Sequence, residues 1–102
     1  LPLGVAMGIG HALYEELPVG ADGPGNGTWN LSRYRIPRAS NVAVWTQEGH
    51  VLPPLSDNDP PKGMAEVTMI PVAAACANAI AQATGHRFDR FPITATRIQE
   101  VL

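Results

Sequence analysis

Glu66 is the acidic residue whose surroundings best suit catalysis. It lies in residues 62–69 (KGMAEVTM), directly before a long apolar stretch. Its neighbours from Val67 onward are mostly apolar, so we expect the carboxylate to lose water, which disfavours the charged form and makes it a stronger base. A base of this kind beside a glycine-containing loop is suited to accept a proton near neutral pH. The structural alternative is that Glu66 caps free backbone N–H groups at a helix start.

Other residue types that do chemistry are scattered along the chain. His11, His50 and His86 lack the spacing of three or four residues that puts two metal ligands on one helix face, so no metal site made of protein side chains is predicted. Residues 57–59 (DND) resemble the start of a calcium loop but lack its later glycine and glutamate, which favours a solvated turn. Cys76, the single cysteine, falls in an apolar helix, where a thiol is expected to be inert.

Three glycines interrupt the first apolar segment, at Gly4, Gly8 and Gly10. Each costs up to about 1 kcal/mol relative to alanine inside a helix, so each needs a reason. Two interpretations stay open: tight packing against a neighbouring element, or close approach of the backbone to a bound ligand. The segment lacks the third glycine and the preceding strand of a dinucleotide-binding motif.

The charges of the chain exclude a strongly basic surface. Seven basic residues stand against nine acidic ones, and the formal net charge is −2. Arg33, Arg35 and Arg38, with Trp29 and Tyr34, form a basic and aromatic patch. A nucleic-acid surface needs more positive charge than this, so we interpret the patch as a solvated face or a contact with a neighbouring subunit.

Three helices are predicted to position these residues. Leu3–Leu17 has apolar residues at helical spacing and ends before a proline. Ile70–Thr84, followed by Gly85, is apolar around its circumference, which is expected inside a large protein rather than on a domain of 102 residues. Thr94 suits the N-cap of the last helix, Ala95–Leu102.

The predicted strands are few and short. Thr28–Leu31 and Asn41–Gln47 have strand-like composition, and Ser32–Pro37 and Arg87–Ile93 are expected to be extended. The proline-rich stretch Pro53–Pro61 is expected to be a loop. The fold class that follows is α+β, with short strands and a buried alanine-rich helix.

The size of the chain predicts one domain or a piece of a larger one. The apolar run Met69–Ala77, interrupted by Pro71, is far shorter than the roughly 20 residues that a membrane-spanning helix needs. No basic segment precedes the first apolar stretch, so a secretory signal is not expected. The first residue is Leu rather than Met, which suggests a fragment.

Seven short motifs follow one another through the whole chain. In order they are Gly4-x-x-x-Gly8-x-Gly10, Leu13-x-Glu15-Glu16, Tyr34-Arg35-Ile36-Pro37, Lys62-Gly63-x-Ala65-Glu66, Ala77-Asn78-Ala79-Ile80, Ala83-Thr84-Gly85 and Phe91-Pro92-Ile93-Thr94. Each is weak alone, but the series resembles the C-terminal part of the molybdenum-binding subunit of the xanthine dehydrogenase/aldehyde oxidase family. The resemblance implies that residues 1–102 are a single C-terminal segment of a larger molybdopterin-binding domain.

The resemblance also implies a reaction and a cofactor. Members of the family hydroxylate an aldehyde or a nitrogen heterocycle with oxygen from water, at a molybdenum ion held by molybdopterin, which in bacteria is generally its cytosine dinucleotide form. Glu66 occupies the place of the family's general base. The residues that the resemblance assigns to cofactor binding are Met7, Gly8, Gly63, Met64 and Ala65. No side chain of this chain is expected to ligate the metal.

Two positions depart from the family's pattern. Met7 stands where xanthine-type enzymes carry a glutamine, so a hydrogen bond to the metal centre is lost. Ala65 replaces the glycine that commonly precedes the glutamate. Both changes leave the chemistry intact but argue against a purine substrate.

The resemblance places the remaining parts of the enzyme outside this chain. Other cofactor and substrate contacts are expected upstream, in the remainder of the molybdenum subunit, so this piece should be inactive by itself. Iron–sulfur centres and FAD are expected on partner subunits or domains. The alternative is a non-catalytic structural or interaction module of the same family, without a cofactor. The compartment is not determined by the sequence, with the cytoplasm favoured over the periplasm.

Overall fold

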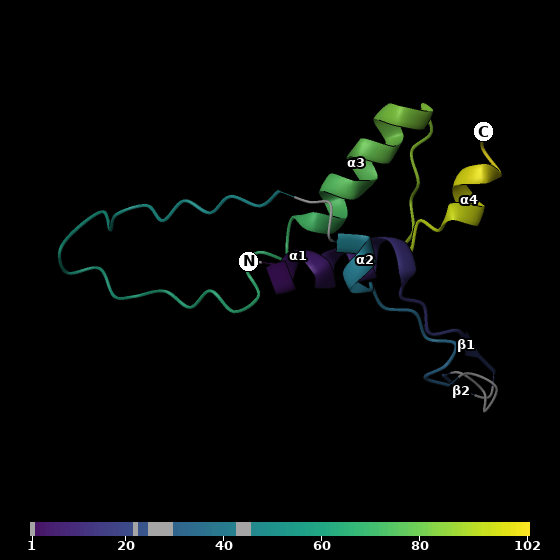
Figure 1. The fold of residues 1–102 in the computed structure, drawn as a ribbon, viewed down its shortest axis with the longest axis horizontal. Helices are drawn as coiled ribbons and strands as arrows, with labels where there is room; N and C mark the ends of the chain where they lie inside the picture. Colours follow the sequence, from purple (N-terminus) through teal and green to yellow (C-terminus); the bar gives the residue numbers. More distant parts are fainter. Residues whose placement is uncertain (1, 22, 25–29, 43–45) are drawn as a thin grey trace.

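The computed structural model describes residues 2–21, 23–24, 30–42 and 46–102 (Figure 1). In chain order the elements are helix α1 (Pro2–Ile9), the π-helical turn η1 (Gly10–Tyr14), strands β1 (Val19–Gly20) and β2 (Gly23–Pro24), and helices α2 (Ala39–Val42), α3 (Val72–Thr84) and α4 (Ala95–Gln99). Helix α1, η1 and the start of α3 contact one another. These three elements form the body of the chain, from which a long arm extends.

The first predicted helix is confirmed over most of its length. Helix α1 continues directly into η1, so the helical segment ends at Tyr14 rather than at Leu17. It ends there because Glu15 leaves the helical conformation, with φ −79° and ψ 118°. The N–H of Glu15 donates to the carbonyl of Gly10 at 2.8 Å, which closes the wider turn.

The alanine-rich helix is confirmed as α3, but its burial is not found in this chain. Gly85 follows the helix with φ 73°, and its N–H donates to the carbonyl of Ala81 at 2.9 Å, as expected for a glycine that ends a helix. None of the residues of α3 is fully buried. Burial was predicted for this helix inside a larger protein, which this chain does not test. Among the described elements α3 packs mainly against α1 and η1, and Nη1 of Arg87 donates a hydrogen bond to Oδ1 of Asn78 on it.

The small core lies where the C-terminal segment meets η1. Ala12 and Ile93 are buried, with 0% and 1% of their surfaces exposed. The N–H of Ile93 donates to the carbonyl of Ala12 at 2.7 Å. Directly after it, the Thr94 side chain accepts a hydrogen bond from the N–H of Arg97, which confirms the predicted N-cap of α4.

The strand predictions are wrong where the structure describes those residues. Asn41 belongs to α2, where its side chain accepts a hydrogen bond from the N–H of Arg38 at 2.8 Å, a local bond that favours a turn over a strand. Leu31 lies in a turn in which Arg33 and Tyr34 both donate to the carbonyl of residue 30. Residues 28–29 and 43–45 of the predicted strands lie outside the described residues.

The sheet content of the described chain is one antiparallel pair. Val19 pairs with Pro24 and Gly20 with Gly23, between β1 and β2. The α+β class is therefore supported only coarsely. The chain is partly helical, with one small piece of paired strand.

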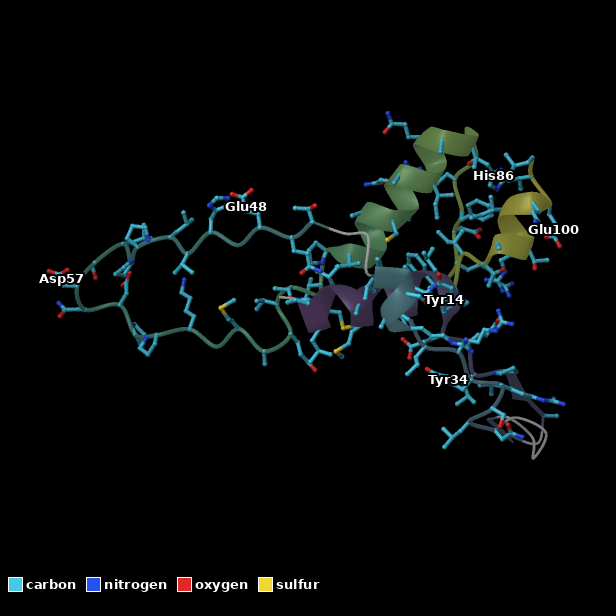
Figure 2. All side chains as sticks on the ribbon, in the orientation of Figure 1. Tyr14, Tyr34, Glu48, Asp57, His86 and Glu100 are labelled. Atoms are coloured by element: carbon cyan, nitrogen blue, oxygen red, sulfur yellow. The ribbon has the colours of Figure 1, made fainter. Side chains whose placement is uncertain are left out.

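Residues 46–67 form an arm that extends from the body, drawn at the left of Figure 1. Every residue of the arm is exposed, and no helix or strand is assigned in it, which confirms the loop predicted for Pro53–Pro61. At its tip the Asp59 carboxylate accepts hydrogen bonds from the N–H groups of Leu55 and Ser56, so the predicted solvated turn is confirmed. Figure 2 shows Asp57 at this outer end.

The arm gives the chain an open shape. The radius of gyration is 17.3 Å, whereas a folded domain of this length has about 13 Å. Large apolar side chains of the arm lie in solvent, among them Val51 and Leu55, which are 92% and 98% exposed. The chain does not bury these side chains by itself.

Candidate active site

Glu66 lies where the arm rejoins the body. Its carbonyl accepts a hydrogen bond from the N–H of Met69 at 3.0 Å, and the carbonyl of Met69 accepts one from the N–H of Val72 at 3.1 Å. These two successive turns lead directly into α3, which begins at Val72. The backbone of Glu66 is therefore hydrogen-bonded into the turns that precede α3.

The expected loss of water around Glu66 is not found in this chain. Glu66 is exposed, as are Ala65 and Val67 on either side of it. Apolar neighbours in sequence bury a carboxylate only when other elements pack over them, and no described element covers this part of the arm. The capping alternative has no support either, because α3 has Pro71 at its N-cap and no side-chain cap.

Two glycines bring α1 against the residues that follow Glu66. A Cβ placed on Gly4 would overlap the Thr68 hydroxyl and lie 3.1 Å from the Thr68 Cβ. A Cβ on Gly8 would lie 2.8 Å from Cγ1 of Val72. Both glycines are buried, and the packing interpretation is confirmed for both. The two glycines are about one helical turn apart on α1, and the residues that they contact, Thr68 and Val72, are likewise four positions apart in the sequence.

The residues expected to bind a cofactor divide into two groups. Met7 lies on α1 beside the buried Gly8 and is 39% exposed. Gly63, Met64 and Ala65 lie on the arm and are all exposed, and no described atom lies within 4 Å of a Cβ placed on Gly63. Helix α1, which carries Met7, packs against Thr68 and Val72, which follow the arm residues in sequence.

A hydrogen bond joins two distant motifs that sequence reasoning left unconnected. The Tyr34 hydroxyl donates a hydrogen bond to Oε1 of Glu15 at 2.8 Å, across 19 residues of sequence. The other carboxylate oxygen of Glu15 fills the space that a Cβ on Gly10 would need. The hydrogen bond to Glu15 raises the pKa of Tyr34, with smaller contributions from burial and from the negative charge of Glu15.

The neighbouring glutamate holds the C-terminal segment. Nη2 of Arg97 lies 3.4 Å from Oε1 of Glu16, and Nη1 of Arg97 donates to the carbonyl of Pro92. With the Ile93–Ala12 and Tyr34–Glu15 bonds, these contacts fix two distant segments on η1. We call this set of residues the clasp. It consists of η1 with the two glutamates that follow it (residues 10–16), Tyr34, and residues 92–97. Glu15–Glu16, Tyr34–Pro37 and Phe91–Thr94 all stand among the sequence motifs, but their spacing does not predict that they meet.

The histidines occupy separate places. The ring of His11 lies 5.3 Å from that of Phe91, and the exposed His50 pairs with Glu48 at 3.2 Å. His86 lies just after α3, at the other end of the helix from Glu66. Within the described ranges, no three His, Cys, Asp or Glu side chains come together as a metal site.

Cys76 is half-buried on α3. Burial raises the pKa of its thiol, so little thiolate forms at neutral pH. This agrees with the predicted inert cysteine.

The basic patch borders a hollow in the described part of the chain. The hollow has a volume of about 750 Å³, and Tyr14, Tyr34, Arg35 and Arg38 are among its lining residues. Arg33, Arg35 and Arg38 are exposed, as expected for a solvated face. Trp29 lies outside the described residues. Among the helices that the structure describes, none has the length and apolar character to cross a membrane.

Comparison with known proteins gives two informative matches. The chain is 34% identical over 107 residues to the xanthine dehydrogenase molybdenum-binding subunit of Escherichia coli O157:H7, a match that covers 95% of this chain and 13% of that protein. It is 51% identical over 45 residues to a nicotinate dehydrogenase subunit of Pseudomonas putida KT2440, which covers 44% of this chain and 4% of that protein. No protein-family model matches. The chain therefore spans only a small part of the length of these relatives.

Proposed function

The chain belongs to the xanthine dehydrogenase/aldehyde oxidase family of molybdenum hydroxylases, and we therefore propose that it carries the general base of such an enzyme. Residues 1–102 would form the C-terminal segment of the molybdopterin-binding domain. The observation that carries the proposal is Glu66 in the segment Lys62–Glu66, within a chain that matches a molybdenum-binding subunit over 95% of its length.

The proposed reaction adds oxygen from water to an electron-poor carbon. A substrate R–H and one water molecule give R–OH, two protons and two electrons. The molybdenum cofactor, when bound, would supply the two-electron oxidation. Glu66 would accept a proton at a carboxylate oxygen as the water oxygen adds to the substrate, which is work suited to a carboxylate shielded from solvent.

The residues present fit this kind of cofactor. The backbone at Gly63 is open, with no described atom where a Cβ would stand, and Met64 beside it is 57% exposed. Gly63, Met64 and Ala65 would contact the cofactor from the arm, and Met7 from α1. The role of Gly8 would be limited to its backbone, because its missing Cβ already makes room for Val72.

An aromatic nitrogen heterocycle is the substrate class that we favour over an aldehyde. Xanthine and nicotinate, in the names of the two relatives, are both nitrogen heterocycles. Met7 replaces the glutamine of the xanthine-type enzymes, which argues for a heterocycle other than a purine. A thioether offers apolar contact and only a weak hydrogen-bond acceptor.

The two electrons must leave the domain through partners. The names of the relatives describe subunits, which supports an assembly of several chains. We propose iron–sulfur and flavin groups on partner subunits or domains as the acceptors, and the cytosine dinucleotide form of the pterin as the cofactor.

The test is a Glu66→Gln substitution in the complete protein with its partners. Turnover should fall by at least about 100-fold, the lower range for loss of a general base, while molybdenum and pterin content stay near normal. Glu48→Gln, on the same exposed arm, is the matched control and should keep turnover. Retained turnover in Glu66→Gln would reject the role of Glu66. A complete protein that purifies without molybdenum or pterin would instead favour the non-catalytic module.

A further inference from the structure

Gly4 contacts the peptide group that holds Glu66. A Cβ on Gly4 would overlap the hydroxyl of Thr68 and would lie 3.4 Å from the backbone nitrogen of Met69. The same nitrogen donates the hydrogen bond to the carbonyl of Glu66. The turn that begins at Glu66 therefore packs directly against the backbone of Gly4, which has no side chain.

The contact is part of a two-point docking of the arm's end onto α1. Gly4 receives Thr68, and Gly8, one helical turn later, receives Val72 at the start of α3. Two contacts one turn apart fix both the translation and the rotation of this segment along α1. Of the two, only the Gly4 contact lies within the turn that Glu66 begins.

We propose that Gly4 is a positioning residue for Glu66, acting through Thr68 and Met69. The proposal rests on the function proposed for Glu66. A Cβ at position 4 would overlap the Thr68 hydroxyl and lie 3.1 Å from the Thr68 Cβ, so the hydroxyl must rotate away and the Thr68 backbone must still yield slightly. The displaced turn carries the backbone of Glu66 with it. A shift of about 1 Å at a catalytic group can cost about 100-fold in rate.

The experiment uses the complete protein with its partners and four variants. Gly4→Ala introduces the overlap. Thr68→Ala removes the hydroxyl and methyl groups that the new side chain would meet. The double variant Gly4→Ala/Thr68→Ala leaves only a tight contact of about 3.1 Å, which small movements relieve. Glu66→Gln is measured in parallel.

We expect Gly4→Ala to lower kcat by about 10- to 100-fold, with KM changed less than about threefold and cofactor content near normal. The double variant should return kcat to within about threefold of the wild type. In the cofactor-free protein, backbone amide exchange over residues 66–70 should rise in Gly4→Ala and recover in the double variant. A residue that only stabilised the fold would lower cofactor content and active fraction instead, without the recovery in kcat.

The outcomes separate this inference from the proposed function. If Glu66→Gln loses turnover while Gly4→Ala keeps its kcat, the positioning role is wrong and the base stands. If Glu66→Gln retains turnover, the proposed function itself fails. If Gly4→Ala yields no soluble protein, a soluble double variant with kcat within about threefold of wild type supports the proposal. An insoluble double variant overturns it.

Discussion

The clasp and the arm differ in how far their side chains are buried and hydrogen-bonded within this chain. In the clasp, residues distant in sequence satisfy one another: Tyr34 binds Glu15, Arg97 binds Glu16, and Ile93 is 1% exposed. In the arm, residues 46–67 are all exposed, apolar side chains included. Glu66, the proposed base, lies at the end of the arm and not in the clasp.

The difference shows which parts of the fold this chain can stabilise alone. The clasp holds two distant segments, at Tyr34 and at residues 92–97, against residues 10–16 through hydrogen bonds within this chain. Hydrogen bonds to Asp59 close a turn at the tip of the arm, but the apolar side chains of the arm are exposed and become buried only if other polypeptide or a cofactor packs over them. The chain spans 13% of the length of the matched molybdenum-binding subunit, so that cover is expected to come from the rest of the protein.

The largest effect should come from the core of the clasp. Ile93→Ala in the complete protein removes a buried side chain and should lower the local free energy of unfolding by about 2 to 5 kcal/mol. Backbone amide exchange at position 93, whose N–H donates to Ala12, should then rise by at least about 30-fold. Ile93→Val is the graded control, with an expected cost of about 0.5 to 1.5 kcal/mol. Equal exchange in all three proteins would mean that the clasp does not depend on this core.

A smaller effect is expected from the hydrogen bond between the two motifs. Tyr34→Phe removes the hydroxyl that donates to Glu15 and should cost about 1 to 2 kcal/mol of local stability, because a hydrogen bond to a charged partner is worth more than a neutral one. Limited proteolysis between residues 31 and 38 measures the loss. Leu31→Ala, at an exposed neighbouring position, is the control. Cleavage of Tyr34→Phe at the wild-type rate would show that this hydrogen bond does not stabilise residues 31–38 against local unfolding.

The same bond should make the clasp sensitive to alkaline pH. The pKa of Tyr34 is raised from its ordinary value of 10.0 in the folded chain, so the neutral phenol stabilises the fold. This contribution is complete below about pH 10. It is lost as the pH rises through the higher pKa of the folded state, because the unfolded chain releases the proton first. Proteolysis between residues 31 and 38 should therefore speed up above pH 10 in the wild type more than in Tyr34→Phe, and parallel profiles would contradict this.

The smallest effect belongs to the partly exposed ion pair. Glu16→Gln removes the carboxylate that faces Arg97 at 3.4 Å and should cost less than about 1 kcal/mol. Amide exchange of α4 (Ala95–Gln99) in the complete protein should rise slightly at low salt and not at about 1 M salt, where screening already weakens the pair. A large loss at high salt would show that Glu16 has a further role.

The helices could be predicted from signals within a few residues of their ends. The contacts between segments distant in sequence could not be predicted in this way. Gly85 and Thr94 mark helix ends through bonds to residues within four positions, so sequence alone was sufficient. The bonds of the clasp join residues 19 and 81 positions apart, which no local pattern reveals. The strand predicted at Asn41 failed because its side chain closes a turn, and strand propensity depends strongly on context.

The candidate site was predictable only in part for the same reason. Glu66 could be singled out by its motif and by the apolar residues after it. The contact between Gly4 and Thr68 could not be assigned, because the spacing of glycines indicates close packing without naming the partner. The Glu66 carboxylate is exposed in this chain, because apolar neighbours in sequence shield a carboxylate only where other elements pack over them.

The most direct test of Glu66 as the general base is its solvent exposure in a structure of the complete, cofactor-loaded protein. We expect the arm to be covered there and the Glu66 carboxylate to lie in a closed pocket, facing the bound cofactor. A carboxylate that still lies in bulk solvent in that intact assembly would contradict the proposed role.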